Sequence, residues 1–238
     1  MHNVHLPQNI IDRLIMKRGK VEIFDSLDPA RTALVVIDMQ NAFVAEGAAL
    51  EVPVARSIVP NINELATASR EAGTAVVWVR ITLAQSGPNA FPVYYRNFFS
   101  PDKAARHQSA LAEGSDSNAL YPELNVEPED IILDKNRFSA MISGSSELEN
   151  ILRAKGIDTI VITGTLSNIC CEATARDAMM LGFNVVFVSD ANAALSDDEH
   201  LASMITIAQG FGDVRTTGET ISILQAGAGA SKRAGEAA

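Results

Sequence analysis

Runs of apolar and β-branched residues recur along the chain at intervals that suit the strands of one sheet. Five runs are candidates for buried strands, at residues 33–37 (ALVVI), 75–80 (AVVWVR), 130–133 (DIIL), 159–163 (TIVIT) and 184–188 (NVVFV). A shorter sixth run covers residues 213–217. Apolar positions within each run are mostly continuous rather than alternating, which is typical of strands covered on both faces in a parallel sheet.

Helical periodicity fills the intervals between these runs. Three candidate helices, at residues 54–72, 145–155 and 170–181, are each followed by a glycine, at Gly73, Gly156 and Gly182. Glycine in this place is a common signal for the end of a helix. A fourth helix is predicted at residues 197–209, where Ser196 suits the N-cap, and a last short helix begins near residue 217. This alternation predicts an α/β protein: a three-layer α/β/α sandwich, Rossmann-like and doubly wound around a mostly parallel six-stranded sheet.

Three segments fall outside the alternation. Residues 1–30 precede the first strand and contain the amphipathic sequence IIDRLIMKR, which we expect to form an arm that packs on a neighbouring subunit. Residues 84–127 are long, rich in proline and predicted to be irregular. Connections of this length usually form lids or interfaces. Residues 227–238 (GAGASKRAGEAA) have the composition of a disordered tail, which leaves residues 31–226 as one domain.

Composition and charge exclude several classes of protein. The 238 residues carry a formal net charge of −10, from 19 Lys and Arg against 29 Asp and Glu, so a nucleic-acid partner is not expected. No apolar run approaches the roughly 18 residues of a membrane span, and no signal sequence is recognisable. Two adjacent cysteines cannot form a framework of disulfides. We therefore expect a soluble, cytoplasmic protein that acts on a small molecule.

Three chemically active side chains follow three different predicted strands. Asp38 follows the first, Lys135 the third, and Cys170 the turn after the fourth. Ligands of doubly wound sheets bind beyond the carboxyl ends of the strands, so these groups are expected to converge. The start of a helix and a nearby lysine would both favour the thiolate of Cys170, and Asp38 could act as general base. Together they indicate nucleophilic hydrolysis of a C–N bond.

Each of these residues also has an ordinary structural interpretation. Taken singly, Asp38 would be a helix cap, Lys135 a solvated charge and Cys170 a small core residue. We assign Cys171 to core packing, because successive helical residues point about 100° apart and only one of them can face the same site. Two alternatives remain open: a redox or binding module that uses both thiols, and a Rossmann-type nucleotide-binding domain. The second is weakened because DMQNAF, rather than a GxGxxG motif, follows the first strand.

Three separated motifs resemble those of the isochorismatase-like cysteine hydrolases: ALVVIDMQNAF, DKNRFSAM and GTLSNICCEATARDAMMLGF. That family includes nicotinamidase, N-carbamoylsarcosine amidohydrolase, ureidoacrylate amidohydrolase, biuret hydrolase and isochorismatase. The resemblance covers roughly residues 31–225 and implies a catalytic triad of Asp38, Lys135 and Cys170. It also implies a cis peptide between Thr165 and Leu166, and an oxyanion hole formed by the N–H groups of Leu166 and Cys170.

Departures from the relatives narrow the implied function. Nicotinamidases look like metal enzymes, with an Asp-x-His motif and a further His after the second strand, but the four histidines here (His2, His5, His107 and His200) do not cluster with a carboxylate. We therefore expect neither a metal nor another cofactor. Isochorismatase cleaves a vinyl ether without depending on a thiol, so its activity is the less favoured alternative. The remaining branch hydrolyses small linear ureido, carbamoyl or amide substrates. The long N-terminal arm and the QNAF sequence most resemble those of its ureidoacrylate and biuret members.

Contacts to the substrate are predicted from position alone. Gln40, Asn41 and Phe43 lie just beyond Asp38, and Arg137 has the planar fork that suits a substrate carboxylate. The aromatic residues of the segment 84–127 are expected to form either a lid or a subunit interface: Tyr94, Tyr95, Phe98 and Phe99. The family resemblance implies a homodimer or a homotetramer. The sequence motif that follows Cys171 contains Arg176 and Asp177, which we interpret as structural.

Overall fold

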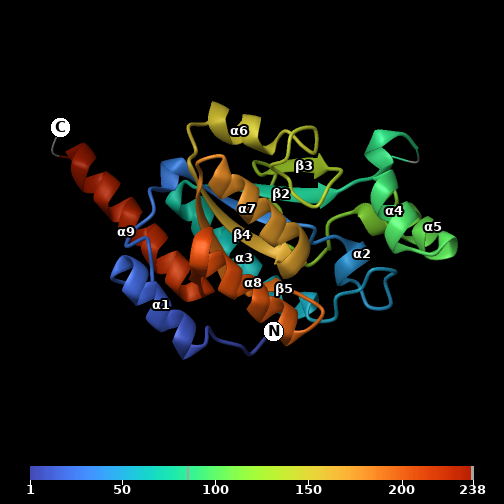
Figure 1. Cartoon of the computed structure of the whole chain (residues 1–238). Helices are drawn as coiled ribbons and strands as arrows, with labels where there is room; N and C mark the ends of the chain where they lie inside the picture. The colour runs from blue at the N-terminus through green and yellow to red at the C-terminus, as the bar shows by residue number, and fades with distance from the viewer. Residues whose placement is uncertain (85, 237–238) are drawn as a thin grey trace.

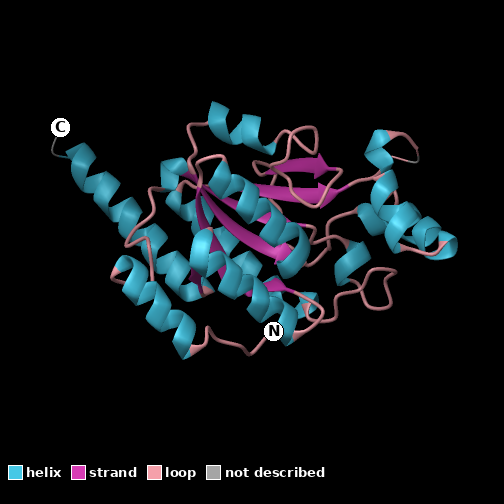
Figure 2. Ribbon diagram, in the orientation of Figure 1, coloured by secondary structure: helices cyan, strands magenta, loops and turns pink. Residues whose placement is uncertain are grey.

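One parallel sheet forms the centre of the molecule, with helices on both of its faces (Figure 1, Figure 2). The computed structural model describes residues 1–84 and 86–236. The six strands lie in the order β3-β2-β1-β4-β5-β6, so the chain starts near the middle, moves to one edge and returns to build the other half. Their bounds are β1 (Thr32–Ile37), β2 (Ala75–Ile81), β3 (Ile131–Lys135), β4 (Thr159–Thr165), β5 (Asn184–Ala193) and β6 (Asp213–Arg215). This topology confirms the predicted doubly wound fold.

Alternate residues of the central strand supply two separate apolar cores. Leu34 and Val36 of β1 face one core, which is covered by α3 (Ala55–Ala72) and α9 (Thr217–Glu236). Val35 and Ile37 face the other core. The second core is covered by α6 (Leu148–Ala154), α7 (Glu172–Met180) and α8 (Asp197–Gly210). All six residues of β1 are buried, which explains its continuous apolar sequence.

The last strand is shorter than predicted because a helix begins where its final residues were expected. β6 ends at Arg215, and α9 begins at Thr217. The carboxylate of Asp190 accepts hydrogen bonds from both the backbone N–H (2.7 Å) and the hydroxyl (2.8 Å) of Thr217. These bonds satisfy polar groups at the start of the helix and so favour a helical start over a continued strand.

The N-terminal segment packs on this chain's own domain rather than reaching away from it. Helix α1 (Gln8–Arg18) buries Ile10 and Leu14 against Ala208 of α8. Figure 1 shows α1, in blue, lying beside the helical layer that contains α8. The amphipathic pattern was therefore interpreted correctly, but the surface that the helix covers here belongs to the same chain.

The segment between β2 and β3 is more helical than its prolines suggested. It contains α4 (Pro92–Phe98) and α5 (Pro101–Ala110), with 3₁₀ turns at Pro88–Ala90 and Asp116–Asn118. Two of the prolines occupy the first position of a helix, where a missing N–H costs nothing and the fixed φ is already helical. Helix α2 (Asn41–Val44) lies on the same side of the molecule as α4 and α5, at the right of Figure 1.

The expected disordered tail is, as far as the structure describes it, the end of a helix. Helix α9 continues to Glu236 and extends beyond the sheet (Figure 1), whereas residues 237–238 lie outside the described residues. Gly227 allows the first part of this helix to approach Leu27 closely, since a Cβ at that position would lie 1.7 Å from the Leu27 carbonyl oxygen. The composition of the tail concealed this, because its glycines were interpreted as signs of disorder. In the described ranges, no helix is long and apolar enough to cross a membrane.

Candidate active site

The carboxyl ends of three strands bring together Asp38, Lys135 and Cys170. Asp38 follows β1, Lys135 ends β3, and Cys170 lies in a π-helical turn, Ser167–Cys171, that connects β4 to α7. The Nζ atom of Lys135 lies 2.8 Å from Oδ2 of Asp38, and both side chains are almost completely buried. The Cys170 thiol is near enough to both of these charges for each of them to shift its pKa. The structure therefore brings all three side chains together at one point.

The backbone of Asp38 has an unusual conformation that its neighbours hold in place. Its φ of 53° lies in the left-handed region, which is uncommon for a residue other than glycine and often found at functional sites. The N–H of Asp38 donates to the Val79 carbonyl (2.8 Å), and its carbonyl accepts from the Thr165 hydroxyl (3.0 Å). Strands β2 and β4 thus hold Asp38 from opposite sides.

A glycine on β4 allows that arrangement to form. Gly164 has a φ of 118°, and a Cβ at this position would lie 2.0 Å from the carbonyl oxygen of Ile37. The absence of a side chain lets the end of β4 lie against the residue that precedes Asp38. As a result, Thr165 comes within hydrogen-bond distance of the Asp38 carbonyl.

Burial and charge shift the pKa values of Lys135 and Asp38 for different reasons. Burial by itself lowers the pKa of Lys135, but attraction to Asp38 and Cys170 outweighs it, so the pKa is raised and the ammonium form persists. Lys135 Nζ also donates to the Arg137 carbonyl at 3.0 Å. Burial raises the pKa of the Asp38 carboxyl, although Lys135 opposes that shift. Asp38 is therefore a stronger base than an exposed aspartate would be.

The pKa of the Cys170 thiol is shifted in the direction opposite to the prediction. A helix start and a nearby lysine were expected to favour the thiolate, yet burial, reinforced by the Asp38 charge, raises the pKa of Cys170 above its usual value. Lys135 opposes the shift without reversing it. The resting thiol is thus protonated and lies against a carboxylate of increased basicity. This arrangement can transfer the proton to Asp38 as the sulfur attacks an electrophile.

The turn that carries Cys170 begins with a cis peptide bond between Thr165 and Leu166, at the position that the family resemblance implies. The Leu166 carbonyl accepts hydrogen bonds from the N–H groups of Ile169 (3.1 Å) and Cys171 (3.2 Å), which close the turn. Cys171 itself is fully buried, with its sulfur 3.9 Å from the Thr163 carbonyl oxygen. Its side chain packs in the core beneath the turn.

A cavity of about 510 Å³ opens onto Cys170 and Leu166. Its other lining residues are mainly apolar or aromatic and come from the loop before α3, the segment between β2 and β3, and the ends of the strands: Phe43, Ala48, Ala49, Leu50, Glu51, Val52, Ile81, Phe91, Tyr94, Tyr95, His107, Leu111, Phe138, Ile169 and Leu195. Among the described residues, this lining includes Phe43 but not Gln40, Asn41 or Arg137.

The three other predicted substrate contacts interact with other parts of the protein, and one of them, Arg137, does so beside the cavity. The Gln40 amide is buried, where its oxygen accepts from the Ile81 N–H (2.8 Å) and its nitrogen donates to the Asn118 carbonyl (2.9 Å). Asn41 donates to the Asp116 carbonyl at 2.9 Å. Arg137 lies over the ring of Phe91, 4.8 Å from its centroid. Gln40 and Asn41 thus join the start of α2 to the strand end and to the segment before β3.

Aromatic side chains form one wall of the cavity. The Tyr94 ring is in edge-on contact with Phe138 (4.9 Å) and in tilted contact with Phe91 (5.1 Å). The aromatic sequence around Tyr94 was a usable signal for this wall. Phe98, which belongs to the same predicted group, is 73% exposed and does not contribute to it. Leu50 and Leu195 were not predicted to line the cavity, because nothing in their local sequence distinguishes them from other apolar residues in loops.

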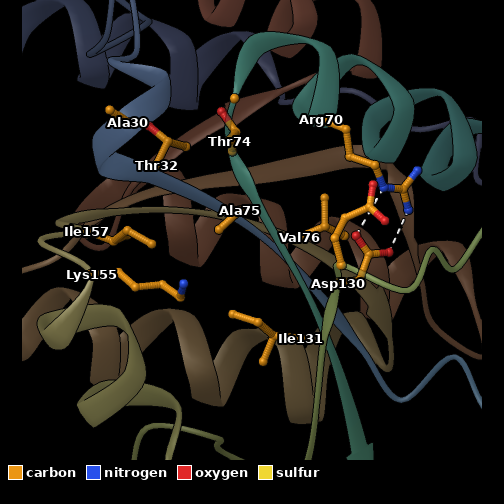
Figure 3. A pocket seen from close by; sticks show the side chains of 12 residues that line it. Ala30, Thr32, Arg70, Thr74, Ala75, Val76, Asp130, Ile131, Lys155 and Ile157 are labelled. Carbon is orange, nitrogen blue, oxygen red and sulfur yellow. Dashed lines mark hydrogen bonds and ion pairs between the residues drawn. The ribbon is translucent and has the colours of Figure 1, made fainter.

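A second cavity of about 540 Å³ lies at the opposite, amino-terminal edge of the sheet (Figure 3). Figure 3 shows Thr32, Ala75 and Ile131, the first residues of three strands, around it. Arg70 on its rim is paired with Asp130, with Nη2 and Oδ2 2.6 Å apart. Its lining contains no thiol, so the first cavity is the candidate active site. Within the described part of the chain, no three His, Cys, Asp or Glu side chains are grouped as a potential metal site.

Comparisons with known proteins identify the family of the chain. The Isochorismatase domain family matches residues 32–219. A cysteine hydrolase from Pseudomonas syringae pv. phaseolicola is 31% identical, with 84% of this chain and 95% of that chain covered and a TM-score of 0.76. An N-carbamoylsarcosine amidase from Thermoplasma acidophilum is 27% identical (79% and 96% covered, TM-score 0.63). A pyrazinamidase/nicotinamidase from Streptococcus mutans is 26% identical (77% and 99% covered, TM-score 0.66). Because the matched domain spans most of its length and the fold is shared with a cysteine hydrolase that is 31% identical, the chain belongs to the isochorismatase-like cysteine hydrolase family.

Proposed function

We propose that this protein is a cysteine-dependent amidohydrolase that cleaves a C–N bond of a small linear amide, carbamoyl or ureido substrate. The observation that carries the proposal is one buried thiol, Cys170, that lines a cavity and lies beside the buried Asp38–Lys135 pair. A thiol so placed has a base to receive its proton and a fixed positive charge beside that base. The amidases among the structural neighbours support the same class of reaction.

The proposed reaction passes through a thioester. Cys170 Sγ forms a bond to the substrate carbonyl carbon while its proton moves to Asp38. The resulting oxyanion lies against the backbone N–H groups of Leu166 and Cys170, a form of stabilisation worth about 3 kcal/mol per donor. Asp38 then returns the proton to the substrate nitrogen, the C–N bond breaks, and ammonia or an amine leaves.

Water completes the proposed cycle. It attacks the thioester carbonyl and gives its proton to Asp38, and the C–S bond breaks as that proton returns to the sulfur. Lys135 remains an ammonium throughout, since its raised pKa opposes loss of its proton. Its charge favours the ionised form of the buried Asp38 before each proton is taken up, first from Cys170 and then from water.

Chemistry of the cavity wall favours an uncharged substrate. The described lining contains no lysine or arginine, and the carboxylate of Glu51, which it does contain, accepts a hydrogen bond from Arg56 at 2.8 Å. Apolar and aromatic side chains provide most of the remaining surface. A substrate carboxylate would lose its hydration against these apolar groups, which is costly, and the Arg137 guanidinium, stacked on the lining residue Phe91, is not itself part of the lining. Neutral amides with a small apolar or aromatic group are therefore preferred over anionic ones.

Ammonia release over a panel of compounds tests this proposal. The panel contains simple aliphatic and aromatic amides, biuret, N-carbamoyl amino acids, maleamate and ureidoacrylate, so that neutral and anionic members can be compared. Cys170→Ala is expected to abolish release while the protein stays folded, as judged by circular dichroism. Cys171→Val is the matched control and should retain release. Turnover that persists in Cys170→Ala would refute the proposal.

A further inference from the structure

Ser167, the first residue of the Ser167–Cys171 turn, is tied to a histidine of another helix. Its hydroxyl lies 2.7 Å from Nδ1 of His200, which belongs to α8. Both side chains are buried, with exposed fractions of 0% and 1%. Serine at the start of a helical turn usually caps a backbone N–H of its own turn. Here the hydroxyl instead connects the turn to α8, 33 residues further along the chain.

The surroundings of His200 keep its imidazole in one protonation state. Burial, with a smaller contribution from His2, lowers the pKa of His200 to about 4, so the ring is neutral near pH 7. The backbone of Ser189 acts in the opposite direction on this pKa, with a smaller effect. In the neutral tautomer that carries its hydrogen on Nε2, Nδ1 is an acceptor for the Ser167 hydroxyl, 2.7 Å away.

The N-terminal segment braces His200 from the other side. The rings of His2 and His200 are stacked, with centroids 4.4 Å apart and an interplanar angle of 14°. His2 Nε2 accepts the N–H of Ala194 (3.0 Å), so Nδ1 must carry the hydrogen that it donates to Asp197 (2.6 Å). His2 is thus held by two hydrogen bonds while its ring covers that of His200.

We propose that His200 is a positioning residue for Cys170: through the Ser167 hydroxyl it holds the turn that presents the Cys170 thiol and the N–H groups of Leu166 and Cys170 to the substrate. Neither Ser167 nor His200 lines the cavity, so the effect passes through the turn rather than through contact with the substrate. This inference rests on the proposed function for its kinetic consequences. Its structural consequence, a turn that loosens when the hydrogen bond is removed, does not.

Kinetics of three variants of the full chain test the inference. We expect Ser167→Ala and His200→Leu to lower kcat roughly tenfold to a hundredfold, the scale on which a misplaced reacting group loses rate, and to leave KM within about threefold. His200→Asn can place an amide oxygen near the position of Nδ1 and should recover part of the loss. A merely structural role would not be rescued in this way, nor would it separate kcat from KM.

Ser203 provides the matched control on the same helix. It is fully buried, one turn beyond His200 on α8, and its hydroxyl donates to Glu172 at the start of α7 rather than to the Ser167–Cys171 turn. Ser203→Ala therefore removes a buried hydroxyl from α8 without releasing Ser167, and kcat should stay within about twofold. A loss equal to that of Ser167→Ala would mean that any loosening of α8 suffices, and would overturn the inference.

Hydrogen exchange supplies a readout that needs no substrate. In Ser167→Ala and in His200→Leu, the amides of residues 166–171 should exchange at least tenfold faster than in the wild type, while those of β1 should not change. If no compound of the panel is hydrolysed, the proposed function fails, and faster exchange still supports the positioning role. If hydrolysis is found but kcat and exchange of the two variants both match the wild type, the inference alone is overturned. A His200→Leu protein that does not fold leaves Ser167→Ala to decide.

Discussion

The Nζ atom of Lys135 lies 2.8 Å from Oδ2 of Asp38, and neither side chain is more than 1% exposed. Each of these buried charges therefore depends on the other for its stability as well as for its proposed role. Removing one partner of such a pair leaves an uncompensated charge in the interior, which usually costs more than the intact pair contributes.

Asp38→Asn should lower the free energy of unfolding by about 3–5 kcal/mol, measured by urea denaturation, because it leaves the Lys135 ammonium unpaired. The double variant Asp38→Asn with Lys135→Met removes both charges and should regain much of that stability without regaining turnover. Asp134→Asn is the control, because Asp134 forms an ion pair with Arg80 in which both side chains are partly exposed (41% for Asp134 and 30% for Arg80). Loss of this pair should change the free energy of unfolding by less than about 1 kcal/mol. An Asp38→Asn protein as stable as wild type would contradict the expected coupling.

Cys171→Val should leave kcat/KM within about twofold and change the free energy of unfolding by less than about 1.5 kcal/mol, because the replaced side chain is a buried apolar group of similar size. Steady-state kinetics and urea denaturation measure the two quantities. A redox or binding module would instead require both thiols. A tenfold loss of activity in this variant would revive that alternative.

Stability should fall in mildly acid solution because of His200. In the folded protein its pKa is lowered from 6.5 to about 4, so below pH 6.5 the unfolded chain binds a proton that the folded chain does not. The free energy of unfolding should therefore decrease as pH falls from 6.5 toward 4, by up to about 3 kcal/mol. His200→Gln cannot titrate and should lack this part of the slope. Urea denaturation of both proteins at several pH values measures the difference, and parallel curves would contradict the prediction.

Gly164→Ala should destabilise the protein by more than about 3 kcal/mol and abolish turnover, because the new Cβ would lie 2.0 Å from the Ile37 carbonyl oxygen. Gly144→Ala is the matched control. Its φ of +76° is also left-handed, but no atom lies within 4 Å of the added Cβ, so only a backbone cost of about 1 kcal/mol is expected. Thermal unfolding, monitored by circular dichroism, measures the change in stability of each variant. Equal shifts would show that close contact with Ile37 is not the deciding factor.

Much of the fold was predictable because burial on both faces leaves a strong local signal. The run ALVVI contains no polar position, and all five of its residues are buried between two helical layers. By contrast, the extent of α4 and α9 was not predictable from composition. The prolines of residues 84–127 favour irregular structure, yet Pro92 begins a helix, and the small, polar composition of residues 227–238 favours disorder, yet Gly227 permits close packing on Leu27. In both cases the local residue type was compatible with two structures, and tertiary context decided.

Convergence of Asp38, Lys135 and Cys170 was predictable because parallel strands end at the same edge of the sheet. The direction of the thiol pKa shift was not, since it depends on how deeply Cys170 is buried, a property of the packed molecule. The contact of Ser167 with His200 was missed for a similar reason. Its two partners lie 33 residues apart, and no spacing rule connects a turn after β4 to a helix after β5.

The reacting groups and the aromatic wall of the cavity come from different parts of the chain. Asp38, Lys135 and Cys170 stand at strand ends, whereas Phe91, Tyr94 and Tyr95 belong to the segment between β2 and β3. Insertions, deletions and exchanges in that segment can alter the shape of the cavity without moving the strands. Substrate preference can therefore diverge between relatives while the strand-end residues are retained, and the same segment is the natural place to redesign the substrate preference of this hydrolase.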